Sequence, residues 1–147
     1  MHYQQSCRSL GIEPIFVEVD AADEIDSAIV QLVRQRLGAV VLRGDDFVYE
    51  HRLEIVAAAT KHGLPTMAED GAIVREAGAL LSYSVTQGEE DRRVASYVDR
   101  ILRGAKPGDL PVEQPTTFEL AINLNTAKAL GLTIPQSLLL RADEVIQ

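Results

Sequence analysis

The chain alternates short apolar runs with amphipathic helical patterns, and this alternation limits its possible folds more than any other feature. The clearest pattern places apolar residues at steps of three and four from Ile25 to Leu37, which predicts a helix that ends at Gly38. The next four residues, Ala39 to Leu42, are all apolar, as expected of a strand buried on both faces. A strand followed by a helix occurs repeatedly, which predicts parallel strands joined by right-handed helical crossovers.

The same reasoning predicts the other elements. Strands are expected at 14–19, 39–42, 64–67 and 79–84, helices at 3–10, 25–37, 49–62 and 89–102, and a loop at 68–78. We therefore expect an α/β fold in which residues 1–103 form a parallel, doubly wound lobe. Residues 104–147 hold four of the six prolines and predict a separate segment with one strand and short helices.

The charge of the chain excludes two classes of partner. The net charge is −8 and the longest basic run is Arg92–Arg93, so we expect neither nucleic acid nor an anionic membrane surface as a partner. No apolar run approaches the roughly 20 residues that span a bilayer, and the first residues do not resemble a secretory signal. A chain complete as written is therefore expected in the cytoplasm.

The turns between strands and helices carry little that could support catalysis. They read RGDDF, AEDGAI and SVTQGEE, and none has the glycine pattern of a nucleotide-binding loop, so no nucleotide cofactor is expected. Asp45 and Asp46 could bind a metal together with Glu69 or Asp70, but capping of the next helix by Asp45 or Asp46 is the favoured interpretation. The three histidines are not placed to form a catalytic triad, so we expect no enzymatic activity, metal or cofactor.

Ligands of open parallel sheets bind beyond the carboxyl ends of the strands. An aromatic ring there can pack an apolar body and a carboxylate can pair with an ammonium group, which favours a small solute with both features. The alternative is that the two rings only cover the edge of the sheet. The residues expected at these ends are Asp45, Asp46, Phe47, Glu69, Asp70, Tyr83, Ser84 and Thr86.

The stretch YVDRILRGAKPGDLPVEQPTTFELAINLNTAKALGLTIP, residues 97–135, resembles the C-terminal part of the ABC-transporter substrate-binding protein family, which includes binding lipoproteins for tryptophan and tyrosine. The stretches EIDSAIVQLVRQRLGAVVL and HRLEIVAAATKHGLPTM agree with it, and the resemblance covers nearly the whole chain. It implies a type I periplasmic-binding-protein fold, with two Rossmann-like lobes, three hinge segments and a solute between the lobes. Residues 1–103 would be the second lobe plus a helix returning toward the first, and residues 104–147 would cross the hinge and supply a strand and terminal helices.

The resemblance also implies a site and partners. The ligand-binding residues that carry over are Asp46, Phe47, Glu69, Tyr83 and Ser84. The partners implied are a small-molecule solute and an ABC permease, and the location is periplasmic or lipid-anchored outside the cytoplasm.

Members of that family are about twice as long as these 147 residues and begin with a signal peptide. We therefore expect a truncated copy that lacks most of the first lobe and dimerises through its unfinished lobe. The alternative function is a cytoplasmic small-molecule-sensing or dimerising module without a role in transport.

Overall fold

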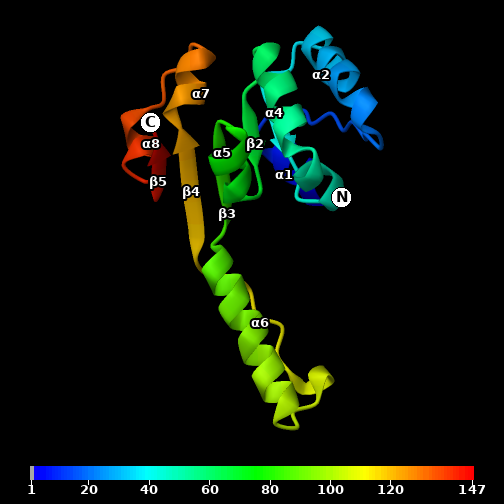
Figure 1. Ribbon diagram of the computed structural model, residues 1–147, viewed down its shortest axis with the longest axis vertical. Helices are drawn as coiled ribbons and strands as arrows, with labels where there is room; N and C mark the ends of the chain where they lie inside the picture. Colours follow the sequence, from blue (N-terminus) through cyan, green and yellow to red (C-terminus); the bar gives the residue numbers. More distant parts are fainter. Residues whose placement is uncertain (1) are drawn as a thin grey trace.

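The computed structural model describes residues 2–147, and it is a five-stranded mixed α/β structure in which helices flank one mostly parallel sheet (Figure 1). The strands lie side by side in chain order, β1-β2-β3-β4-β5. All neighbouring pairs are parallel except β3 and β4, which are antiparallel. The strands are β1 (Val40–Leu42), β2 (Thr66–Ala68), β3 (Leu81–Val85), β4 (Phe118–Asn123) and β5 (Glu144–Ile146).

The helices agree with the predicted periodicities at most positions. The predicted helix at 49–62 is divided at His51 into α3 and α4, and the helix predicted at 89–102 begins two residues earlier. The helices are α1 (His2–Ser9), α2 (Ile25–Arg34), α3 (Asp46–Glu50), α4 (Arg52–Lys61), α5 (Gly71–Ala77), α6 (Gln87–Leu102), α7 (Leu124–Ala129) and α8 (Gln136–Leu139), with two short 3-10 turns, η1 (Ala22–Glu24) and η2 (Pro107–Asp109).

The core lies between one face of the sheet and the helices α4 and α5. A row of paired positions crosses this face from β1 to β4, and its members Leu42, Ala68, Ser82 and Ala121 are all buried. Three of the four are small residues. Small side chains let a helix approach a sheet closely, and α5 packs there through buried Ile73 and Val74.

Two predictions about individual segments are wrong. Residues 68–78, predicted as a loop, contain α5, which is only seven residues long and is started by the Asp70 carboxylate accepting a hydrogen bond from Ala72 N–H at 2.8 Å. A helix this short is stable because it is buried against the sheet. Its seven residues are too few to show a clear helical periodicity in the sequence. Residues 14–19, predicted as a strand, have no regular secondary structure. Val17 and Val19 are half-buried there, but the segment pairs with no strand in the described part of the chain.

The chain leaves the sheet after β3 and returns to it before β4. Figure 1 shows α6 projecting away from the sheet, with the following residues running back beside it to the start of β4. Because the chain re-enters the sheet at the end where β3 leaves it, β4 must run antiparallel to β3, with Val85 opposite Phe118. The prediction of an entirely parallel sheet therefore holds for every pair but this one.

Candidate functional site

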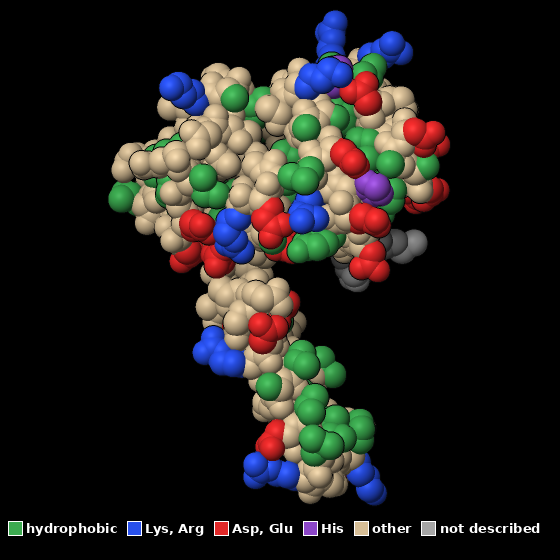
Figure 2. Space-filling model, viewed as in Figure 1, with side chains coloured by type: hydrophobic (Ala, Val, Ile, Leu, Met, Phe, Trp, Pro, Cys, Tyr) green, Lys and Arg blue, Asp and Glu red, His purple; other side chains and the backbone are tan. Residues whose placement is uncertain are grey.

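The carboxyl ends of β1, β2 and β3 lie along one border of the sheet because these strands are parallel. Figure 2 shows acidic and basic side chains gathered along the lower border of the globular part, above the projecting helix. The turns that leave these strands hold Arg43 to Asp45, Glu69 and Asp70, and Thr86. The border therefore combines charged groups of both signs with exposed backbone, which suits a small polar ligand.

Glu69 connects the first two of these turns. Its Oε2 accepts a hydrogen bond from Gly44 N–H at 3.2 Å, so the side chain predicted as a ligand contact also fixes the turn after β1. Tyr3, from α1, lies close enough that its partial burial, together with Cys7 and Glu69, raises the pKa of its hydroxyl above the usual 10.0. The Arg43 guanidinium lies 5.9 Å from the Tyr3 ring centre. A ring, a guanidinium and a carboxylate thus meet at this border.

The acidic turn after β1 starts a helix. Asp45 Oδ1 accepts a hydrogen bond from Val48 N–H at 2.7 Å, which confirms the predicted capping role. Asp46 is exposed in the first turn of α3, whereas Phe47 packs against the core cluster and lies 4.6 Å from the His51 ring. Among residues 2–147 no group of three or more histidine, cysteine or acidic side chains is placed to hold a metal ion.

Tyr83 and Ser84 lie on opposite faces of the sheet because adjacent strand residues alternate. Tyr83 stacks on Phe118 of β4, with ring centres 5.3 Å apart and an interplanar angle of 11°, and both rings are exposed. Ser84 is half-buried opposite Glu119, on the face that carries α5. The five predicted residues therefore do not converge on one point: Glu69 lies in the linked turns, Asp46 starts the adjacent helix, and the others lie on three different surfaces.

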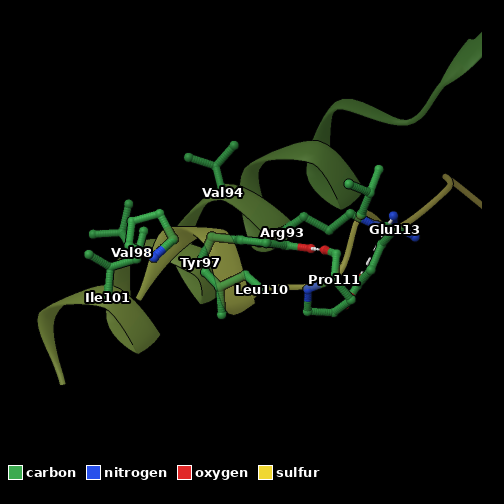
Figure 3. Close-up of a pocket in the computed structure, with 10 residues that line it drawn as sticks. Arg93, Val94, Tyr97, Val98, Ile101, Leu110, Pro111 and Glu113 are labelled. Carbon is green, nitrogen blue, oxygen red and sulfur yellow. Dashed lines mark hydrogen bonds and ion pairs between the residues drawn. The ribbon is translucent and has the colours of Figure 1, made fainter. Parts of the chain in front are cut away.

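A second surface lies along α6, where a groove of about 550 Å³ separates the helix from the returning segment (Figure 3). Tyr97 donates a hydrogen bond to the Pro111 carbonyl across this groove. The next stripe of the helix is apolar and exposed, with Val94 at 64%, Val98 at 49% and Leu102 at 81% exposure. α6 has 16 residues and none of them is buried, which is unusual for a helix of a folded domain. An exposed apolar stripe of this kind is typical of a surface that contacts another body.

Sequence reasoning missed three side chains at these surfaces: Tyr3, Arg43 and Phe118. Arg43 directly follows a predicted strand, so its position was readable from the same rule that selected Asp46. Tyr3 and Phe118 gave no local signal, because each reaches its neighbour through a contact between segments far apart in the chain.

Comparison with known proteins identifies related families and structures. Residues 3–146 match a family model described as ABC transporter substrate binding protein. A search of curated proteins gives no significant match.

Within residues 2–147, no helix has the length and apolar character needed to span a membrane.

Three solved structures are similar over nearly the entire chain. A conserved domain protein from Vibrio cholerae has 26% identity and a TM-score of 0.87, over 97% of this chain and 47% of its own. An ABC domain from Streptococcus pneumonia in complex with L-Trp has 26% identity and a TM-score of 0.86, over 99% of this chain and 50% of its own. The ligand-free, open structure of CD0873, a substrate binding protein with adhesive properties from Clostridium difficile, has 19% identity and a TM-score of 0.71, over 99% and 48%. The chain thus spans about half the length of each.

Proposed function

This chain belongs to the ABC transporter substrate-binding protein family, and we propose that it forms one lobe of the solute-binding component of an ABC-type importer. The observation that carries the proposal is the pairing of a polar sheet border, where Glu69 joins two turns, with an α6 face that nothing in residues 2–147 covers. A solute-binding cleft needs both a polar border and a second body that closes over it.

The border suits a zwitterionic solute with an apolar side chain. The Glu69 carboxylate can pair with an ammonium group, and Arg43, which has no ion pair among the described residues, can pair with a carboxylate. The Tyr3 ring lies beside both and can pack the apolar part of the solute. The L-Trp complex of the Streptococcus pneumonia domain supports an aromatic amino acid as the first solute to test. Asp46, Phe47, Tyr83 and Ser84 stay candidates for peripheral contacts.

The second body is a further lobe of the same kind. In this proposal residues 1–103 supply one lobe and α6, and residues 104–147 cross back and complete the sheet with β4 and β5. About half of each similar structure lies outside the part that matches this chain, which leaves room in those proteins for such a second lobe. When only this lobe is present, we expect the apolar stripe of α6 to pair with the same stripe of a second copy.

Solute capture in this proposal requires no chemistry by the protein. His51 pairs with Glu54 at 2.6 Å and His62 with Asp26 at 3.4 Å, so both histidines are engaged by surface carboxylates. The partner that receives the solute is an ABC permease, and capture takes place outside the cytoplasm, as in the family.

Binding of L-tryptophan to the purified chain tests the function directly. The chain contains no tryptophan, so fluorescence excited at the red edge of the indole band comes from the ligand alone. We expect the anisotropy of L-tryptophan to rise with protein concentration, with a dissociation constant of about 1 mM because only one side of the solute is buried. Glu69→Ala and Arg43→Met should each weaken binding at least about tenfold.

The matched control is Glu18→Ala, because Glu18 is an exposed carboxylate in the irregular segment before α2. It should bind like the unmodified chain. If neither L-tryptophan nor any other proteinogenic amino acid binds at millimolar concentration, a solute-binding role for this chain by itself is wrong.

A further inference from the structure

One face of α6 carries three side chains that hold the returning segment. Glu89, Arg93 and Tyr97 follow one another at steps of four, so they form a single stripe along the helix. Their partners on the returning segment occur in the reverse order of the chain and lie progressively farther from the sheet: Thr117 and Thr116, then Glu113, then Pro111. The stripe is therefore a set of ties between two antiparallel segments that leave and re-enter the sheet.

Glu89 makes the contacts nearest the sheet. Its Oε2 accepts a hydrogen bond from Thr117 N–H at 2.9 Å, and its Oε1 accepts one from Thr116 N–H at 3.3 Å. Arg93 lies 2.6 Å from the same Oε1, and its other terminal nitrogen lies 3.9 Å from Glu113. The Glu89 side chain is only 13% exposed, whereas residues 111–117 are themselves exposed. The last backbone hydrogen bond between the two segments runs from Thr86 N–H to the Thr117 carbonyl, at the end of the β3–β4 ladder. Beyond this bond, the Glu89 carboxylate takes over the role of backbone acceptor.

Within residues 2–147, Glu89 is the one acceptor for the backbone N–H groups of residues 111–117, and two of these residues are prolines, which have no N–H group. Without Glu89, the hydrogen bonds and ion pairs between residues 111–117 and α6 would be reduced to those of Arg93 and Tyr97, farther from the sheet. The carboxylate also stands in the first turn of α6, where the helix dipole favours a negative charge. The hydrogen bonds from Thr117 and Thr116 and the ion pair with Arg93 hold the pKa of Glu89 at about 2, so it is charged at neutral pH.

We propose that Glu89 is a positioning residue that locks α6 and residues 111–117 into one rigid arm and thereby sets the direction in which α6 leaves the sheet. These two segments cross a hinge only if the protein has the proposed two lobes. The role of Glu89 in lobe closure therefore rests on the proposed function. If two hinge segments of a two-lobed binder are tied to each other, they rotate as one unit when the lobes close. The lobes then close along one path and meet in one orientation. The rigid arm itself is a property of this chain and needs no solute.

Distance measurement between spin labels tests the arm without any ligand. One label is placed on α4 by Ala57→Cys and one on α6 by Ser96→Cys, both at exposed positions, in a chain whose native thiol is removed by Cys7→Ser. Double electron–electron resonance on the labelled chain, diluted with an excess of unlabelled chain so that distances between copies do not contribute, should give a single narrow distance distribution for this parent. Glu89→Gln, which cannot accept both N–H groups while pairing with Arg93, should broaden the distribution about twofold.

Glu90→Gln is the matched control, because Glu90 is the exposed neighbour of Glu89 and its side chain has no hydrogen-bond or ion-pair partner among the described residues. It should leave the distribution narrow. If Glu89→Gln has lost helical circular dichroism, Glu89→Asp replaces it, since it keeps the charge but is one methylene too short for the bridge. A distribution as narrow as the parent's in the folded Glu89 variant would overturn the proposal, while the proposed solute binding would stand or fall on the L-tryptophan titration alone.

Discussion

The guanidinium of Arg75 on α5 lies 2.8 Å from the carboxylate of Glu144 on β5, although 69 residues separate them in the chain. The nitrogen that makes this contact, Arg75 Nη1, also lies 2.8 Å from Glu119 on β4. The hydrogen bonds to Glu144 and then to Glu119 raise the pKa of Arg75 above its usual value. One side chain therefore ties the helix over the centre of the sheet to the two strands that come from the C-terminal segment.

Replacing Arg75 with methionine should lower the free energy of unfolding by about 1 kcal/mol, because two partly exposed ion pairs are lost and two carboxylates are left side by side. Urea unfolding followed by circular dichroism measures the change. Arg141→Met removes an exposed arginine that has no ion pair in the described residues and should change stability by less than about 0.5 kcal/mol. Equal effects of the two variants would show that the bridge contributes nothing.

Gly71 stands at the start of α5, under the Arg75 side chain. A Cβ atom built there would lie 2.9 Å from the Arg75 guanidinium, so Gly71→Ala should push that group away from its carboxylates. We expect a loss of about 1 kcal/mol in the unmodified chain and none in the Arg75→Met chain. A double-mutant cycle on unfolding free energies measures this coupling. Additive effects would mean that the guanidinium moves aside while keeping its ion pairs.

The Glu89 bridge should make stability depend on pH in acid. Its pKa is about 2 in the folded chain against an ordinary value of 4.5, so its stabilising contribution is complete above about pH 4.5. That contribution is lost as the pH falls from 4.5 toward 2, because the carboxylate becomes protonated in the folded chain too. The difference in urea midpoint between the unmodified chain and Glu89→Gln should therefore be constant from pH 7 to pH 5 and shrink below pH 4.5. A difference unchanged at pH 3 would contradict the depressed pKa.

The apolar stripe of α6 should govern self-association of the chain. Val98→Glu places a charge in the middle of the stripe, and the cost of burying that charge opposes pairing of two copies. Sedimentation velocity should show a dimer for the unmodified chain and a monomer for the variant at the same concentration. Ser96→Glu, which adds the same charge to an exposed polar position of α6, should remain dimeric. A monomeric unmodified chain would rule out this contact.

The alternation of strands and helices could be predicted because each element has its own local pattern. The Ile25 to Leu37 periodicity and the apolar run at 39–42 are readable without any knowledge of the rest of the chain. The strand at 14–19 was predicted by the same rule and is absent, because a strand needs a neighbour and the described residues provide none there. α5 was missed for the opposite reason: its pattern is weak, and it forms because the sheet buries it.

Local sequence alone predicts the α/β class, a helix cap by Asp45 or Asp46 and the turns that lie at the carboxyl border, since these depend on neighbours within a few residues. Which of the two aspartates caps the helix, and which side chains meet at this border, depends on the folded chain. Tyr83 stacks on Phe118, and Arg75 reaches Glu144, because the chain makes a long excursion through α6 and returns in one particular register. That register is selected by the burial of a whole row of side chains across the sheet, and no local pattern contains this information.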